Sequence, residues 1–311
     1  MALPDFLIIG AQKSGTTWLA DQLARHPLVY MAPREIHFFD KEHNWNRGQP
    51  WYETHFAEAE GRLIGEKTPD YLWTGVEGAE GHMPDAHRHL YATVPNARLI
   101  VVLRNPVDRA ISALTHLIRT RRVPPVHAMD ALLMGDKQKL IQGHGIVEKG
   151  YYHRQLVAYA ELFRPSQLLV LIFETDIAVR PADGMEKIWS FLGLPPALIH
   201  RSTGAERNSS RRSRLRLLSD YYLPFLRPVS RIFDRMGPPW KPALSSSDIT
   251  MLYQLYEEEN RLLFEFLNQP VPEAWLRPDL RASDSGDTGQ EATPVILRQE
   301  RRSPRRRDRP V

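Results

Sequence analysis

Residues 6–18 read FLIIGAQKSGTTW, an unbroken apolar run followed by a polar loop that contains two glycines. The run Phe6–Ile9 predicts a strand buried on both faces, as in a parallel sheet covered by helices. Apolar residues then recur at helical spacing from Trp18 to Ala24, and His26-Pro27 ends that pattern. The stretch therefore predicts a strand, a loop and a helix that opens at Gly15.

The loop has the composition of an anion-binding site. Glycine lets backbone amides approach a ligand closely, and the N-terminus of a helix favours phosphate or sulfate. An ordinary turn between strand and helix is the alternative, but a lysine and several hydroxyl groups coincide directly after the strand. We expect the anion to be bound by Lys13, Ser14, Gly15, Thr16, Thr17 and Trp18.

Two features distinguish this loop from a Walker A motif, which has Lys and then Ser or Thr after its second glycine. Here Gly15 is followed by Thr16-Thr17, and the strand at 99–103 ends in Arg104 rather than in a metal-binding Asp. An arginine at the carboxyl edge of a parallel sheet recruits a second anion. ATP–Mg fits this arrangement poorly. A nucleotide with two separated anionic groups and no required metal, 3′-phosphoadenosine 5′-phosphosulfate (PAPS), fits it well.

Strand and helix patterns alternate along the rest of the chain, which is typical of a parallel sheet with helices on both faces. We therefore predict an α/β fold with a P-loop-like central parallel sheet flanked by helices on both faces. Asn105-Pro106 reads as the cap and first residue of a helix. Further strands are predicted at 62–65, 98–103 and 167–173, and further helices at 152–163, 185–192, 215–233 and 248–267.

The charge of the chain is concentrated at its C-terminus. The net charge is +4, while residues 298–311 carry seven Arg against two acidic residues, so that about −1 remains for the rest. We predict one domain over residues 1–280, a disordered Arg-rich tail over 281–311, and no nucleic-acid partner.

Other compositional features exclude several classes of site. No cysteine is present, which excludes disulfides and Cys-ligated metals. The apolar runs are of strand length and the N-terminus lacks the features of a signal peptide, so we expect no transmembrane segment and a cytoplasmic location.

Four ordered motifs resemble those of PAPS-dependent sulfotransferases. The stretch AQKSGTT at 11–17 resembles their 5′-phosphosulfate loop, and LRNPVDRAIS at 103–112 resembles their 3′-phosphate motif. EIHFFD at 35–40 and GEKTPDY at 65–71 resemble the heparan sulfate sulfotransferase branch. The likeness covers roughly residues 5–270 and is extended by WY at 51–52, KGYY at 149–152 and FLGL at 191–194.

The resemblance implies roles for single residues. It makes Glu35 the general base and Lys13 the contact to the phosphosulfate, which steadies the leaving phosphate. The implied catalytic residues are Glu35, Lys13, His37 and Lys67, and the implied acceptor-site residues are His37, Asp40 and Lys67. The implied ligands of the nucleotide, beyond the loop itself, are Arg104 and Ser112 for the 3′-phosphate and Ser210, Arg211 and Arg212 in a later loop.

Simpler interpretations stay open for several of these residues. Glu35 can be a solvated loop residue, His37 a structural histidine, and Lys67 a surface charge at a strand end. Phe38 and Phe39 are expected in the core or cleft wall. The histidines at 82, 87 and 89 are expected at solvent-exposed helix positions rather than at a metal, and no metal site is predicted anywhere.

The predicted reaction is in-line transfer of the sulfuryl group to a hydroxyl or amine. The acceptor is expected to be a small molecule or glycan, with a carbohydrate or glycolipid among the candidates. A P-loop-type small-molecule kinase is one alternative, and a non-catalytic nucleotide-binding module is another. The expected lack of an anchor and of disulfides departs from the Golgi enzymes of the family, which argues against a glycosaminoglycan acceptor but not against the chemistry.

Overall fold

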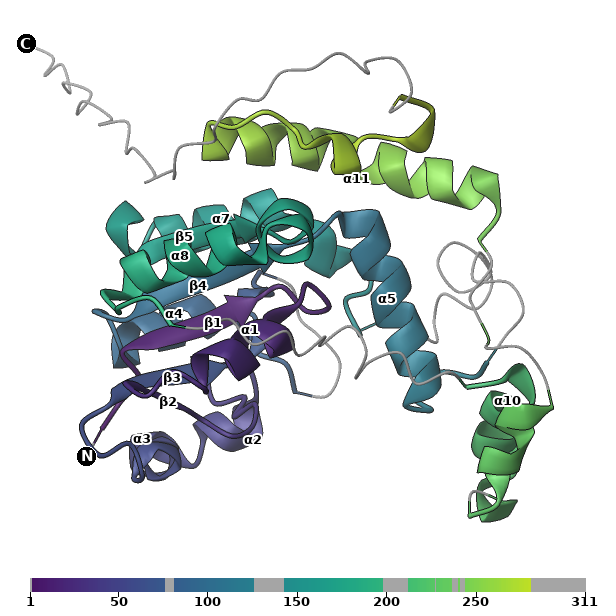
Figure 1. Ribbon diagram of the computed structural model, residues 1–311, viewed down its shortest axis with the longest axis horizontal. Coiled ribbons are helices and arrows are strands. Elements are labelled where there is room, and N and C mark those ends of the chain that lie inside the picture. The colour runs from purple at the N-terminus through teal and green to yellow at the C-terminus, as the bar shows by residue number, and fades with distance from the viewer. Residues whose placement is uncertain are drawn as a thin grey trace, which may run out of the picture.

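A computed structural model describes residues 2–75, 81–125, 143–197, 212–226, 228–236, 240 and 244–280. Within this part, five parallel strands form one sheet in the order β2-β3-β1-β4-β5 (Figure 1). The strands are β1 Phe6–Gly10, β2 Val29–Met31, β3 Leu63–Lys67, β4 Arg98–Leu103 and β5 Leu168–Ile172. Four of the five were predicted, and the three-residue strand β2 was not.

Strand β1 lies at the centre of the sheet. Phe6 pairs with Gly65 of β3 on one side and with Arg98 of β4 on the other. All five residues of β1 are buried, which confirms the prediction from the apolar run. Since successive side chains of a strand point to opposite faces, the same short run supplies both halves of the core.

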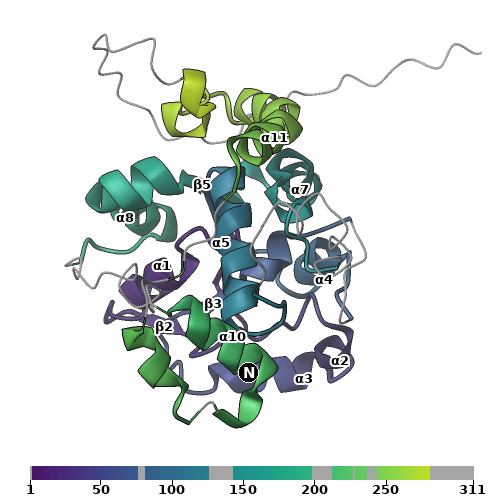
Figure 2. The ribbon, with the colours of Figure 1, turned by 90° about the vertical axis from the view of Figure 1, so that its right-hand side faces the viewer.

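Helices cover both faces of the sheet, as predicted, and Figure 2 shows the two layers. The helices α1 (Thr16–Leu23) and α8 (Pro181–Leu192) lie on one face, where Leu19 and Ile188 pack with Phe6. On the other face lie α4 (Ala86–Thr93) and α7 (Tyr152–Ala160), whose side chains pack with Leu7. The short helices α2 (Glu42–Trp45) and α3 (Gly48–Glu53) follow β2 along the chain.

Helix α5 (Pro106–Arg119) begins as the sequence predicted. The Asn105 side chain accepts hydrogen bonds from the amides of Val107 and Asp108, and Pro106 is the first helical residue. The sequence then continues from β4 through Arg104 directly into this helix, so that Arg104 lies at the carboxyl edge of the sheet.

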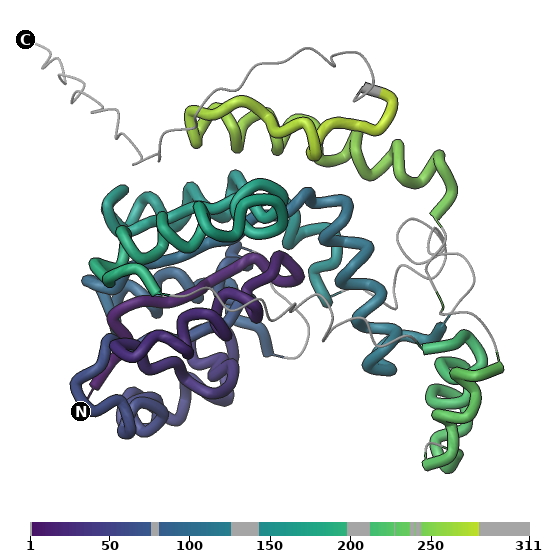
Figure 3. Tube along the Cα trace, viewed as in Figure 1, coloured from purple at the N-terminus to yellow at the C-terminus, as the bar shows by residue number. Residues whose placement is uncertain are grey.

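Residues near the C-terminus hold the start of α5 in place. After helix α11 (Ser246–Leu267) the chain turns back alongside it (Figure 3). Asn105 Nδ2 donates to the carbonyl of Ala274 at 2.8 Å and to the hydroxyl of Tyr253 at 3.1 Å. Glu174 accepts from the amide of Asn105 and from Trp275 Nε1, each at 2.9 Å. One buried cluster thus joins residues that lie about 170 positions apart.

One predicted helix was wrong in extent. The pattern at 215–233 predicted a continuous helix, but α10 covers Arg214–Tyr222 and is followed by two short 3₁₀ helices, Pro224–Leu226 and Ser230–Arg235. Pro224 has no N–H to donate and disfavours helical geometry at Leu223. The helices predicted at 152–163, 185–192 and 248–267 correspond to α7, α8 and α11.

Among the described residues, no helix is long and apolar enough to cross a bilayer. The Arg-rich segment 281–311 lies outside the described residues, and the single domain over 1–280 stays a prediction.

Candidate active site

The loop after β1 has the backbone of an anion cradle. Lys13 and Gly15 both have positive φ, at 70° and 86°, before α1 begins at Thr16. Gly15 is required here, because a Cβ would also lie 2.9 Å from the Phe173 ring. Successive amides in such a turn converge on one point, and the unpaired amides of the first turn of α1 add to them. The loop is therefore shaped for a negatively charged group.

Lys13 lies in a strongly cationic environment. Burial lowers its pKa, and the positive charges of Arg104 and Arg119 lower it further. A cation held close to other cations is stabilised by an anion between them, because each positive charge then gains a partner. The arrangement thus favours an anionic ligand at Lys13.

Arg104 lies beside the anion loop and offers a further hydrogen-bond donor. Its Nη1 donates to the carbonyl of Lys13 at 3.2 Å, and its guanidinium lies 5.1 Å from the centre of the Phe173 ring. Its Nε is buried and has no hydrogen-bond partner among the described residues. An orphaned buried donor of this kind fits a phosphate oxygen. Ser112 is half-buried on α5, the helix that begins two residues after Arg104.

Glu35 and Lys67 lie between the anion loop and the rest of the crevice. Lys67 Nζ binds Glu35 Oε1 at 2.6 Å and Thr17 Oγ1 at 3.4 Å. Burial alone would raise the pKa of Glu35, but hydrogen bonds from His37 and Lys67 and the charge of Lys67 lower it below its ordinary value. One carboxylate, ionised at neutral pH, is thus linked through a lysine to the first turn of α1.

His37 and Asp40 complete this line. His37 Nδ1 lies 2.9 Å from Asp40 Oδ2, and His37 Nε2 lies 3.5 Å from Glu35 Oε2. Burial disfavours the charged ring, yet the hydrogen bonds to Asp40 and Glu35 raise the pKa of His37 to about 10. At neutral pH the ring is an imidazolium, which has no lone pair to accept a proton or to bind a metal. It holds Glu35 in place as a cation.

His37, Asp40 and Asp70 place one potential ligand atom each within 4.8 Å of one another. Their carboxylates are already paired with cations, Asp40 with His37 and Asp70 with Lys149 at 2.8 Å. Burial would raise the pKa of Asp70, but Lys149 lowers it to about 2. This group is accounted for by ion pairs.

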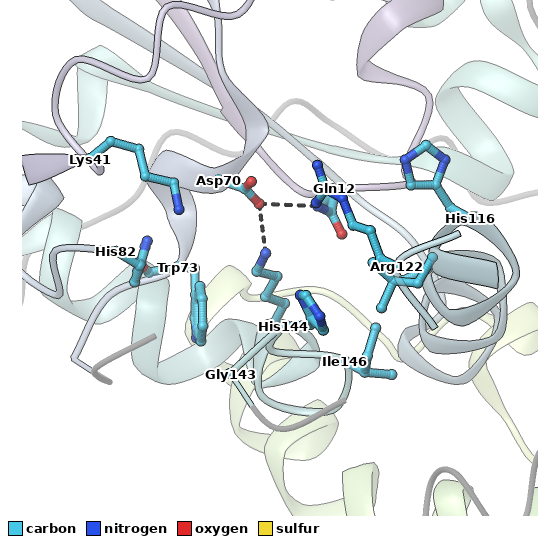
Figure 4. A pocket seen from close by; sticks show the side chains of 13 residues that line it. Gln12, Lys41, Asp70, Trp73, His82, His116, Arg122, Gly143, His144 and Ile146 are labelled. Atoms are coloured by element: carbon cyan, nitrogen blue, oxygen red, sulfur yellow. Dashed lines mark hydrogen bonds and ion pairs between the residues drawn. The ribbon is translucent and has the colours of Figure 1, made fainter. Parts of the chain in front are cut away.

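A polar pocket opens next to this line, as Figure 4 shows. Asp70 lies between Gln12, which donates at 3.3 Å, and Lys149. One wall is aromatic: the His82 and Trp73 rings stack at 4.2 Å, and Lys149 Nζ lies 4.6 Å from the Trp73 ring centre. The lining also includes the cationic side chains of Lys41 and Arg122 together with His116 and His144.

Several of these residues were not predicted from the sequence. Partial burial and the charges of Lys13 and Arg122 lower the pKa of His116 to about 4, so that it is neutral. His116 and Arg119 follow Ser112 at intervals of four and seven residues, which places all three on one face of α5. That spacing was a usable signal. Lys149 and Asp70 lie in the motifs KGYY and GEKTPDY, but the sequence gave no signal that they pair, because they are 79 residues apart.

Of the three residues predicted to bind the nucleotide from a later loop, only Arg212 lies among the described residues. Ser210 and Arg211 lie outside the described residues. Arg212 Nη1 donates to the carbonyl of Arg119 at 2.9 Å, which places it at the C-terminal end of α5. Its predicted contact with the nucleotide stays a prediction.

The expectation of solvent exposure was wrong for His82 and His87, which are buried, and His82 precedes α4. His89 lies on α4 as expected, but it is half-buried and its ring stacks on Trp45. His82 Nε2 lies 3.0 Å from the carbonyl of Trp73, and His87 packs against the Tyr159 ring. Aromatic stacking and a hydrogen bond offset the cost of removing the His82 ring from water. Phe38 and Phe39 are buried in the core, as expected.

Comparison with known proteins places these features in a family. A model of the sulfotransferase domain matches residues 3–215. The chain is 29% identical to the human bifunctional heparan sulfate N-deacetylase/N-sulfotransferase 2, over 91% of this chain and 32% of that protein. It is 28% identical to the mouse heparan sulfate glucosamine 3-O-sulfotransferase 3A1, over 75% of this chain and 63% of that protein.

The chain thus spans between about one third and just under two thirds of the length of these relatives. Among solved structures, a sulfotransferase from Alicyclobacillus acidocaldarius matches with a TM-score of 0.63 and 22% identity, over 89% of this chain and 100% of that chain. That likeness supports the fold. The family match includes the anion loop, the segment with Glu35, and Arg104.

Proposed function

The chain belongs to the sulfotransferase family, and from this premise we propose that it transfers the sulfuryl group of PAPS to an acceptor hydroxyl or amine. One observation carries the proposal: the Glu35 carboxylate is linked by Lys67 to Thr17, in the first turn of the helix that follows the anion loop. A proton acceptor and a site for the phosphosulfate group therefore lie side by side.

In the proposed reaction the acceptor atom attacks sulfur from the side opposite the leaving phosphate. The new bond to sulfur forms as the bond from sulfur to the bridging oxygen breaks, and Glu35 takes the acceptor's proton. The products are the sulfated acceptor and 3′-phosphoadenosine 5′-phosphate (PAP). Lys13 and the loop amides stabilise the negative charge that develops on the phosphate. Arg104, with Ser112, binds the 3′-phosphate.

We further propose a carbohydrate acceptor that carries an acidic group. The relatives act on heparan sulfate, according to their names. The pocket next to His37 combines an aromatic wall with the cations Lys41 and Arg122, and its only carboxylate among the described residues, Asp70, is paired with Lys149. Such a lining matches a sugar ring with a negative substituent.

The protein is expected to transfer labelled sulfate from PAPS to saccharides, and most readily to acidic ones. An assay with PAPS and a panel of neutral and acidic saccharides, read by mass spectrometry, checks this. EDTA is expected to leave the rate within about twofold, since the cationic side chains take the role of a metal. Transfer of phosphate from ATP that requires Mg²⁺ would instead establish the kinase alternative.

Replacing Arg104 with alanine is expected to weaken PAP binding about 10- to 100-fold, because a charge-assisted hydrogen bond contributes about 1.5–3 kcal/mol. ADP lacks a 3′-phosphate, so its Kd is expected to change little. Isothermal titration of both ligands measures the difference. Arg98→Ala, an exposed arginine at the other end of β4, is the matched control. Equal losses for PAP and ADP would show that Arg104 supports the fold instead.

A further inference from the structure

The backbone that carries Glu35 is held by side chains from the turn after β3. The amides of Ile36 and His37 donate to Thr68 Oγ1 at 3.2 and 3.5 Å. The amide of Phe38 donates to the Tyr71 hydroxyl at 2.9 Å. Three successive amides directly after Glu35 are therefore bound by two hydroxyl groups.

This segment needs such support, because its conformation is unfavourable by itself. His37 has a φ of 54°, in the left-handed region that non-glycine residues rarely adopt. The Glu35 side chain is 38% exposed, so packing alone does not fix it. Asn44 Nδ2 adds hydrogen bonds to the carbonyls of Ile36 and His37, at 3.1 and 3.2 Å. Specific hydrogen bonds hold the base in its position.

A hydroxyl group has one hydrogen and can rotate, so it serves as an acceptor only when its hydrogen is committed elsewhere. Glu66 provides that commitment. Its Oε1 accepts from Thr68 Oγ1 at 2.8 Å and from the Tyr71 hydroxyl at 2.7 Å, and its Oε2 binds the Tyr52 hydroxyl. The lone pairs of Thr68 and Tyr71 are thereby left for the amides of the segment 36–38.

We infer that Glu66 is a positioning residue for the Glu35 base: by fixing the direction of the Thr68 and Tyr71 hydroxyls, it fixes the backbone that carries the carboxylate. The inference rests on the proposed function. Glu66 is fully buried and does not contact the crevice. Consecutive residues of a strand point to opposite faces, so the neighbouring Lys67 points away from Glu66. Lys67 binds the Glu35 side chain. Two adjacent residues of β3 therefore hold the base, one through its backbone and one through its carboxylate.

Glu66→Met tests this directly. Methionine removes both carboxylate oxygens, so the hydroxyls of Thr68 and Tyr71 lose the common acceptor of their hydrogens and are free to turn away from the segment 36–38. We expect kcat to fall about 10- to 100-fold, as for a displaced catalytic group, while the Kd for PAP stays within about twofold. In a Glu35→Gln background the same change is expected to cost almost nothing further in kcat, because the group that it positions is gone. Equal losses in both backgrounds would overturn the inference.

A second pair of variants keeps the test valid if Glu66→Met does not fold. Thr68→Val keeps the shape of the side chain but removes the acceptor for two amides, and Thr68→Ser restores the hydroxyl. We expect a loss of about 10-fold or more in kcat for valine and recovery to within about threefold for serine. Tyr71→Phe is expected to lower kcat as much as Thr68→Val does. Tyr256→Phe, which removes a buried hydroxyl bonded to the carbonyl of Val147, serves as its control. A valine variant with normal kcat would overturn the inference.

Amide hydrogen exchange separates this inference from the proposed function. In Thr68→Val and Tyr71→Phe, the amides at 36–38 are expected to exchange at least 10-fold faster than in the parent protein, while those of β1 stay protected. If the parent protein transfers no sulfuryl group but this change in exchange occurs, the hydrogen-bond network stands and the proposed function fails. Unchanged exchange at 36–38 would remove the physical basis of the inference.

Discussion

Glu35→Gln is expected to lower kcat by a factor of 10²–10⁴, the usual contribution of a general base, with little change in the Kd for PAPS. Glutamine keeps the shape of the side chain and can still meet Lys67, so the crevice should keep its form. What it loses is the ability to accept the acceptor's proton. Stopped-time assays with labelled PAPS at saturating acceptor measure kcat, and titration calorimetry with PAP measures donor-site integrity.

The pH dependence gives a second readout of the same variant. His37 and Lys67 lower the pKa of Glu35 below its ordinary value of 4.5. The carboxylate therefore stays ionised until the pH falls to that lowered pKa. A base works only when it is deprotonated, so kcat is expected to fall as the pH drops through that region, and the glutamine variant should lack this limb. Glu58→Gln, at an exposed position away from the crevice, is the control. A normal kcat with an unchanged profile would place the base elsewhere.

Lys13→Ala is expected to reduce the rate by about 100-fold or more, because it removes the full charge nearest to the developing negative charge. The Kd for PAPS should rise as well, since the loop then binds the anion with amides and hydroxyls alone. The measured quantities are kcat and the Kd for PAPS and PAP.

Two further substitutions separate charge from packing at this position. Lys13→Met keeps much of the length of the side chain without the charge, and its rate should be as low as that of Lys13→Ala. Lys13→Arg keeps the charge and should retain more activity, with a loss from its different geometry. Activity of the methionine variant within a few-fold of the parent would show that Lys13 is not the electrostatic stabiliser.

Local patterns predicted the parts of the fold that local physics determines. The apolar run of β1, the glycine before α1 and the Asn105-Pro106 cap each specify their element within a few residues. Strand β2 has only three residues, too few for a periodic signal. The helix predicted at 215–233 failed because the apolar pattern continues through Pro224, where the backbone cannot.

The site shows the same division. Lys13, Glu35, Lys67 and Arg104 lie in recognisable motifs, and the structure brings them to one crevice. The role inferred for Glu66 was not visible in the sequence, because the segment 36–38, which its partners Thr68 and Tyr71 hold, lies 32 and 33 residues from them. The burial of His82 likewise could not be predicted from the sequence, because it results from stacking on the Trp73 ring. Contacts between distant segments decide these cases.

The cluster around Asn105 sets how short a working fragment of this protein can be. A piece cut at residue 215, where the family match ends, would retain every motif that is predicted to bind the donor. It would lose Trp275 and the carbonyl of Ala274, leaving Glu174 and Asn105 Nδ2 buried without these partners. It would also uncover the apolar surface against which Leu263 and Phe264 pack. We therefore predict that a working fragment must extend to about residue 275, some 60 residues past the end of the family match, because a boundary at residue 215 would separate these partners.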